Sequence, residues 1–171
     1  AKLAFPVRKV KLHRVPPTSA ELKLIQVVGQ EILKLNKLAQ ISLLKALVSS
    51  PQALVSQLKN MAAKGTMPEA SVASITDIAR QIDVTSKLRG LETLTDQLRR
   101  ERPSDWRMVV FTQLLETQKV ISEYLELKGI RFGIISGESS HRNQETIRRF
   151  STSVPEINVV VSTEAGSEGV N

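Results

Sequence analysis

Three short apolar runs in the second half of the chain constrain its fold more than any other feature. They lie in the stretches "WRMVVFTQ", "IRFGIIS" and "INVVVS". Because β-branched residues suit the pleated backbone, and because strands covered on both faces are apolar throughout, the runs predict buried strands of a parallel sheet. Amphipathic segments separate them, and the first of these ends at Gly129, a residue type that commonly terminates helices. This alternation predicts an α/β fold with right-handed crossover connections.

The first half of the chain has the pattern of helices. Apolar residues recur at helical spacing from Glu21 to about Val48, and again from Pro51 to about Ala63. Pro51 marks the start of the second helix, because proline is tolerated in a first helical turn. We interpret the leucine-rich stripe of these helices as core packing in preference to a partner-binding face.

The stretches around these helices have weaker patterns. "RKVKLHRV" alternates loosely and is compatible with a short edge strand, whereas Thr18 or Ser19 offers a cap for the helix that follows. "AAKGTMPEASVAS" predicts a loop. We therefore expect an N-terminal strand and helical subdomain over residues 1–85. An α/β domain follows over residues 86–171, entered by the amphipathic helix "SKLRGLETLTDQLRRE".

Composition excludes several classes of protein. The chain has 171 residues, of which 41% are hydrophobic, and no cysteine, so disulfides, thiolate metal sites and a cysteine nucleophile are excluded. No uncharged apolar run reaches the length of a membrane span, and the first residues lack the apolar stretch of a signal peptide. We expect a cytoplasmic protein with no membrane partner, associated with the nucleoid if it is bacterial.

The formal net charge of +7 makes nucleic acid the first polyanion to consider, because phosphates attract lysine and arginine irrespective of base sequence. Five basic residues and no acidic ones fall within the first twenty positions: Lys2, Arg8, Lys9, Lys11 and Arg14. The alternative is a solvated basic face without a ligand. Charge therefore indicates a class of partner without locating the contact.

The sequence holds no complete catalytic site. It lacks a G-x-x-x-x-G-K-[ST] phosphate loop, an H-E-x-x-H zinc motif and a G-x-G-x-x-G turn opening a helix. His13 and His141 lie in different halves with no carboxylate pattern, so we expect no metal site. Glu164 and Glu168 flank Gly166, but a pair of loop carboxylates is weak evidence for acid–base chemistry.

The third apolar run ends in "STEAGSEGVN", a loop at the carboxyl end of a strand, which is the edge where open α/β sheets place ligands. This loop belongs to a series of motifs that resembles the C-terminal lobe of superfamily-two helicases, and within them the Swi/Snf-like DNA-dependent ATPases. "TSKLRGLETLTDQL" resembles the helix that enters the lobe, "MVVFTQ" resembles motif IV, "SGESSHRNQETIRRF" resembles the following motif, and "STEAGSEGVN" resembles motif V. At positions 164 and 168, the glutamates of this sequence resemble the bacterial branch that includes the RNA-polymerase-recycling ATPase.

The resemblance implies a RecA-like, P-loop NTPase-type sheet and a set of site residues. It implies DNA-backbone contacts by Thr163, Gln113 and Arg142, although Gln113 and Arg142 are equally suited to bracing loops. A threonine hydroxyl can donate to a phosphate without reading base sequence, and glycines let backbone N–H groups approach a polyanion. Gly166, Gly169 and Asn171 are accordingly expected at the ATP cleft. The motifs are supported by Phe111, Thr112, Gly137, Phe150 and Ser162, of which Gly137 also fits a plain turn and Ser162 a satisfied loop hydroxyl.

The resemblance also implies a larger parent ATPase. The family's Walker lysine and metal-binding acids belong to the preceding RecA-like lobe, and an arginine-bearing motif follows motif V; phosphoryl transfer needs these parts together. We therefore expect ATP and Mg²⁺ as cofactors of the parent, a lobe incomplete after motif V, and no ATP hydrolysis by this part alone. Expected partners are DNA, the preceding lobe and a DNA-bound protein such as RNA polymerase. The alternatives are a non-catalytic basic α/β interaction module and a lobe of a superfamily-two RNA helicase.

Overall fold

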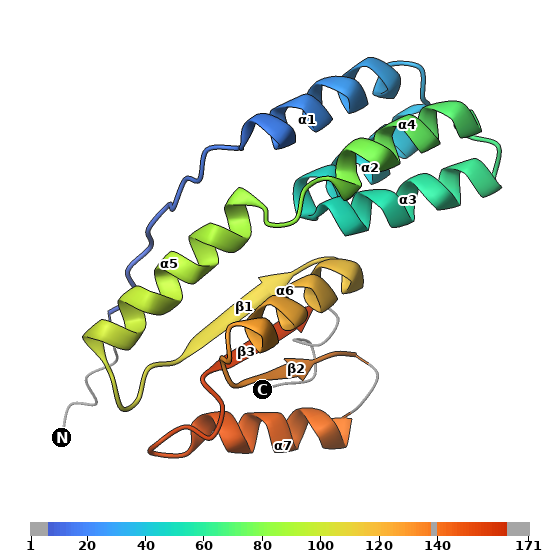
Figure 1. Ribbon diagram of the computed structural model, residues 1–171. Coiled ribbons are helices and arrows are strands. Elements are labelled where there is room, and N and C mark those ends of the chain that lie inside the picture. The colour runs from blue at the N-terminus through green and yellow to red at the C-terminus, as the bar shows by residue number, and fades with distance from the viewer. Residues whose placement is uncertain (1–6, 138–139, 164–171) are drawn as a thin grey trace.

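The computed structural model describes residues 7–137 and 140–163 and combines a helical subdomain with a small α/β domain (Figure 1). The described elements, in chain order, are α1 (Ser19–Ile32), α2 (Lys37–Ser49), α3 (Pro51–Ala63), α4 (Glu69–Arg80), α5 (Ser86–Glu101), β1 (Met108–Thr112), α6 (Leu115–Leu127), β2 (Phe132–Ile135), α7 (Ser140–Ser151) and β3 (Val159–Thr163). The predicted succession of strands and helices after residue 86 is confirmed.

Helices α1 and α3 begin at the capping residues that the sequence offers. Thr18 caps α1 in a reciprocal capping box with Glu21, and Ser50 caps α3 with Pro51 in the first turn. These side chains satisfy backbone N–H groups that a helix start leaves without partners. The apolar stripe of the helices is mainly core, as predicted, with Val28, Leu54, Leu58 and Met61 buried together.

Three local predictions for this half are wrong. Residues 7–18 form no strand, because they lie outside the sheet and no described neighbour offers them backbone hydrogen-bond pairing. The stretch from Glu21 to Val48 is two helices, because the Asn36 side chain caps a new start at Lys37. The expected loop at residues 62–74 is helical from Glu69, since Val72 and Ile75 supply the stripe that packs into the bundle core.

The sheet is parallel, with strand order β1–β3–β2, as the alternation of elements predicts. Every residue of β3 is buried, which confirms the interpretation of "INVVVS" as a covered strand. Alternate side chains of β3 point to opposite faces. Val159 and Val161 pack against α6 residues such as Leu125, whereas Val160 packs with Ile147 and Phe150 of α7. The two crossover helices therefore cover opposite faces of the sheet (Figure 1).

β1 differs from the fully buried strand that the sequence predicts. Met108 and Val110 pack on the α6 side, but Val109 and Phe111 on the other face are exposed. Among the described elements α7 contacts β2 and β3 but has no comparable contact with β1, so this face of the edge strand stays open. A groove of about 270 Å³ lies there, lined in part by Phe111, Ile147 and Phe150.

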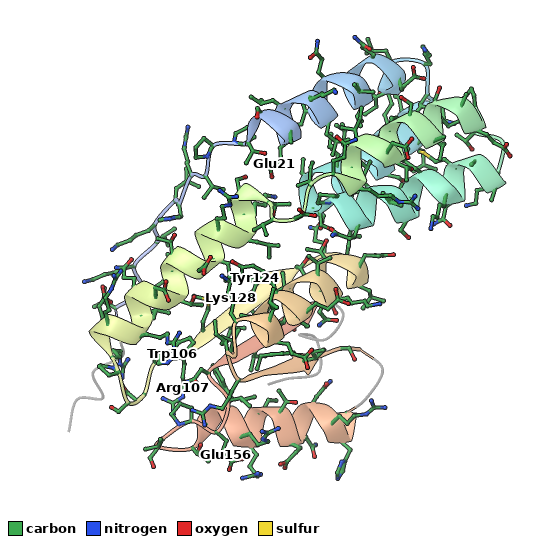
Figure 2. All side chains as sticks on the ribbon, in the orientation of Figure 1. Glu21, Trp106, Arg107, Tyr124, Lys128 and Glu156 are labelled. Atoms are coloured by element: carbon green, nitrogen blue, oxygen red, sulfur yellow. The ribbon has the colours of Figure 1, made fainter. Side chains whose placement is uncertain are left out.

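The segment of residues 7–18 runs alongside α5 before the chain enters α1 (Figure 1). Val15 lies so close to Gly90 of α5 that a Cβ on this glycine would come within 2.7 Å of the valine methyl group. Farther along, the hydroxyl of Tyr124 on α6 donates to Glu92 of α5 at 2.6 Å, and Lys128 pairs with the same carboxylate at 2.7 Å (Figure 2). α5 is thus held against the segment before α1 and against α6.

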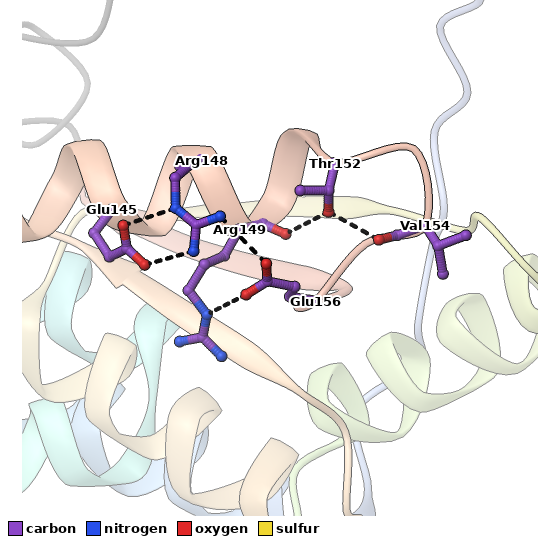
Figure 3. A network of polar contacts seen from close by, with 6 residues as sticks. All are labelled: Glu145, Arg148, Arg149, Thr152, Val154 and Glu156. Carbon is purple, nitrogen blue, oxygen red and sulfur yellow. Dashed lines mark hydrogen bonds and ion pairs between the residues drawn. The ribbon is translucent and has the colours of Figure 1, made fainter.

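A polar network fixes the turn that leads from α7 into β3 (Figure 3). Glu156 accepts from Arg148 at 3.3 Å and from Arg149 at 3.2 Å, and Glu145 pairs with Arg148 one turn earlier. All these groups are exposed, so solvent screens each pair and its contribution to stability is small. Arg107 complements the network by donating to the Phe150 carbonyl at 2.7 Å, which ties the segment before β1 to the end of α7.

Candidate nucleic-acid interface at the carboxyl edge of the sheet

The three strands end at one edge, and the sheet register decides which motif residues meet there. Thr112 at the end of β1 lies directly opposite Thr163 at the end of β3, and Ile135 at the end of β2 lies opposite Ser162. Because parallel strands point the same way, the segments after all three strands begin at this edge. The structure therefore brings together motif ends that are about twenty to fifty residues apart in the sequence.

The side chains of Thr163 and Ser162 lie at this edge but are buried. Thr163 is 4% exposed and Ser162 is 2% exposed. The Ser162 hydroxyl donates to the Thr163 carbonyl at 3.1 Å, so it behaves as a satisfied buried hydroxyl. The Thr163 hydroxyl is at the predicted edge, but its burial leaves little surface for a ligand.

Gln113 and Arg142, by contrast, are exposed. Gln113 follows β1 directly, and Arg142 lies in the first turn of α7, which begins after the carboxyl end of β2. Both positions are at the same edge as Thr163. An exposed guanidinium and an exposed amide are suited to donate to a phosphate oxygen.

The other motif residues divide between the edge and the core. Phe111 is 64% exposed on β1, and Thr112 beside it is half-buried. Gly137 is exposed in the turn after β2, as a plain turn glycine would be. Phe150 packs against the cluster of Ile135, Ile157 and Val160, so its position is explained by packing of α7 on the sheet.

The residues expected at the ATP cleft, Gly166, Gly169 and Asn171, lie outside the described residues, as do Glu164 and Glu168. Their placement at a nucleotide site remains a prediction. Within residues 7–137 and 140–163, no group of three or more histidine, aspartate or glutamate side chains is arranged to hold a metal ion.

Two residues that sequence motifs did not identify organise this edge. Gln118 of α6 is buried, and its Nε2 donates to the carbonyls of Ile135 at 3.0 Å and Val161 at 2.9 Å, one on each neighbouring strand. Asn143 of α7 pairs with both backbone groups of Ser136, accepting from its N–H at 3.3 Å and donating to its carbonyl at 2.7 Å. The helical period contained a signal for Gln118, because it falls three residues before the buried Ile121.

A cavity of about 340 Å³ adjoins the end of β1 and brings in the helical subdomain. Thr112 and Gln113 line it from the sheet, and Lys45 of α2 and Lys87 of α5 line it from the helices. Neither lysine belongs to a motif that the sequence analysis had assigned to a ligand. The arrangement adds positive charge to an edge that already carries Arg142.

None of the described helices combines the length and apolarity required to cross a lipid bilayer. This observation concerns residues 7–137 and 140–163 alone.

Comparison with known proteins places the α/β half of the chain in a family. Residues 87–171 match the model of the helicase conserved C-terminal domain. A search of curated proteins returned no match. Among solved structures, the Hef helicase domain of Pyrococcus furiosus aligns with a TM-score of 0.51 and 21% identity, covering 88% of this chain and 37% of that one. The C-terminal part of the Fun30 ATPase domain aligns with a TM-score of 0.48 and 14% identity, over 89% of this chain and 66% of that one.

The chain thus spans 37% of the length of the Hef helicase domain, and at this identity the likeness concerns the fold, a RecA-like parallel sheet flanked by helices. The residues that match the family model include the parallel sheet and both of its crossover helices. Residues 87–171 of this chain are therefore a helicase C-terminal domain.

Proposed function

We propose that this chain contributes the second motor lobe of a Swi/Snf-like, ATP-dependent DNA translocase and holds the phosphodiester backbone at the carboxyl edge of its sheet. The convergence of motif ends carries the proposal: Thr112 lies opposite Thr163 in the sheet, and Gln113 and Arg142 are exposed beside them. The family match over residues 87–171 supports a helicase-type parent, and the net charge of +7 supports a polyanionic partner.

Burial assigns different roles to the residues of this edge. Arg142 and Gln113 are accessible, so in the proposal they donate to phosphate oxygens. Thr163 is buried, so its contribution is to end β3 in register with β1 and to place the segment that follows. Backbone contacts of this kind hold a strand without reading its bases, which a translocase requires because it moves over any sequence.

ATP and Mg²⁺ are assigned to the cleft between this lobe and the preceding one. Hydrolysis needs a phosphate cradle, a metal and a stabilising arginine acting together. Gly166, Gly169 and Asn171 are the residues of this chain proposed to face the nucleotide. The remaining machinery is assigned to other parts of the parent, so the chain alone is expected to hydrolyse no ATP.

The test compares ATP hydrolysis by the parent protein at increasing DNA concentration. Arg142→Gln should raise the DNA concentration needed for half-maximal stimulation about tenfold, because a hydrogen bond to a charged group contributes about 1.5–3 kcal/mol. Thr163→Val should change this DNA concentration less, since the Thr163 side chain is buried. Lys64→Gln, which removes an exposed charge beyond the end of α3, is the matched control.

Equal effects of Arg142→Gln and Lys64→Gln would contradict the assignment of this edge. Stimulation by RNA and not by DNA would favour an RNA helicase lobe, and absence of stimulation by either would favour a non-catalytic interaction module. The Swi/Snf-like branch and an RNA-polymerase partner are tested separately, by translocation on duplex DNA and by co-purification of the parent with RNA polymerase.

A further inference from the structure

The cavity beside the end of β1 has an apolar wall and a polar wall, and the charged side chains among its described lining residues are all cationic. It lies between the end of α2, the start of α5, the end of β1 and α6, and encloses about 340 Å³. Lys45 and Lys87 line it, and no aspartate or glutamate is among the described residues that do so. The nearby Glu116 is outside the lining and accepts instead from Ser56 at 3.1 Å. The cavity therefore carries positive charge that no carboxylate among its described lining residues offsets.

The two lysines retain donors for a ligand. Lys87 Nζ donates to the carbonyl of Val48, which positions the ammonium group at the cavity and leaves two of its three N–H groups. Lys45 Nζ has no hydrogen bond or ion pair to any residue in the described ranges. An ammonium group without a partner in the described part of the chain, at the wall of a cavity, is available to bind an anion.

Three hydroxyl-bearing residues in the same wall contact one another, and together they have one O–H donor more than these contacts require. Thr117 Oγ1 lies 2.6 Å from Ser49 Oγ and 2.9 Å from Ser50 Oγ, while Ser50 Oγ also accepts from the Ala53 N–H. Three O–H groups share two hydroxyl–hydroxyl contacts, and each contact uses one proton. Whichever way they are oriented, one O–H remains without an acceptor in this group. Thr117 and Ser50 are buried, and all three residues are among those that line the cavity.

We infer that this cavity binds a phosphodiester group of a DNA backbone through Lys45, Lys87 and the Ser49–Ser50–Thr117 hydroxyls. Ammonium and hydroxyl donors, with no carboxylate among the described lining residues, match a singly charged phosphate that presents acceptors only. The inference rests on the proposed function and extends it. The DNA track would run from the sheet edge onto the helical subdomain, which supplies Lys45, Ser49 and Ser50.

Charge and hydroxyl contacts can be separated by the salt dependence of DNA binding. Each phosphate neutralised by a cation contributes about 0.9 to the slope of log K against log salt concentration, whereas a neutral hydroxyl releases no counterion. Binding of a fluorescently labelled duplex of arbitrary sequence to the chain is measured by anisotropy over a range of NaCl concentrations.

The double variant Lys45→Gln and Lys87→Gln should reduce the magnitude of this slope by about 0.9, because both lysines are proposed to neutralise the same phosphate. The control pair Lys59→Gln and Lys64→Gln removes two exposed charges from α3 and its C-terminal end, outside the cavity, and should change the slope by less than about half as much. Ser49→Ala should weaken binding about threefold with an unchanged slope. Ser56→Ala, whose hydroxyl pairs with Glu116, should leave both unchanged.

Lys45→Arg, which keeps the charge, should retain the slope, and thermal unfolding of each variant checks that the fold is intact. Equal slopes for the cavity and control pairs, with the wild-type chain still binding DNA, would overturn this inference and leave the proposed function standing. No binding of DNA by the wild-type chain would remove both. If ATP or inorganic phosphate at matched ionic strength displaces DNA from the wild type but not from the double variant, the cavity holds a free phosphate or nucleotide and the assignment to a backbone is wrong.

Discussion

The carboxylate of Glu21 joins the start of α1 to the start of α5 through Ser86. It accepts from the Ser86 N–H at 3.2 Å and from the Ser86 hydroxyl at 3.2 Å, and it also accepts from the Thr18 N–H at 2.7 Å in the capping box. One side chain therefore serves two helix N-termini, although Glu21 and Ser86 are 65 residues apart in the sequence. Burial acts to raise the pKa of Glu21, but the hydrogen bonds from Thr18 and Ser86 outweigh it, and the net pKa is lowered.

Replacing Glu21 should therefore destabilise the chain in a pH-dependent way. We expect Glu21→Gln to lower the free energy of unfolding by about 1 kcal/mol at neutral pH, the difference between charged and neutral hydrogen bonds. Because the folded-state pKa is below the ordinary value of 4.5, the contribution is present above that pH and is lost as the pH falls through the folded pKa. The wild-type and variant stabilities should thus converge in acid. Urea unfolding at several pH values measures this, with exposed Glu126→Gln as the control.

Gly133 of β2 is required by the close approach of α7. A Cβ there would lie 2.6 Å from the Thr146 Cγ2 and 2.8 Å from the Ile157 Cδ1. We expect Gly133→Ala to cost about 1–3 kcal/mol through overpacking. Combining it with Thr146→Ser, which removes the closest methyl group, should recover part of that loss in thermal unfolding.

Gly29 in the interior of α1 provides the matched control, because nothing lies within 4 Å of a Cβ at that position. Gly29→Ala should stabilise the chain by up to about 1 kcal/mol through helix propensity. If both glycine variants shifted the stability in the same direction, the packing argument for Gly133 would be wrong.

Gln118 should be the most sensitive polar side chain beneath the carboxyl edge. Its amide bridges the carbonyls of Ile135 and Val161, so Gln118→Leu loses two buried hydrogen bonds and is expected to cost about 1–3 kcal/mol. Hydrogen exchange should also increase near the ends of β2 and β3. Gln97→Leu, at an exposed position of α5, should change stability by less than about 0.5 kcal/mol.

Tyr124 is the single tyrosine of the chain, so its ionisation can be followed alone. Burial raises the pKa of its phenol, and the hydrogen bond to Glu92 raises it further. The folded chain should consequently form tyrosinate at higher pH than the unfolded chain, which ultraviolet absorbance measures directly. A raised pKa contributes stability below the ordinary value of 10.0 that is lost as the pH rises through the folded pKa.

Tyr124→Phe removes both this pH dependence and the hydroxyl contact between α6 and α5. We expect a loss of about 1 kcal/mol near neutral pH, the usual contribution of one hydrogen bond. A folded-state titration at the ordinary tyrosine pKa, together with unchanged stability of the variant, would show that the contact with Glu92 does not form in solution.

Local signals in the sequence determined most of the element order of this protein. Ser50 with Pro51, Thr18 with Glu21, and Gly129 act on their immediate neighbours, so the helix boundaries that they mark agree with the structure. The apolar runs likewise predicted the strands, and the order of motifs predicted the helicase C-terminal domain. Where such local signals were weak, as in residues 7–18 and 69–74, the predictions were wrong, because neighbouring elements decide those segments.

Only the tertiary structure decided which residues meet. Sequence periodicity does not specify that β3 lies between β1 and β2, yet this order sets Thr112 opposite Thr163 and leaves one face of β1 open at Phe111. Nor could motifs bring Lys45 of the helical subdomain to the end of β1. Burial and proximity depend on long-range packing, since a side chain is covered by elements distant in sequence. The helices and strands could therefore be predicted largely from local sequence signals. The cavity lined by Lys45 and Lys87 could not, because it forms only where the helical subdomain packs against the α/β domain.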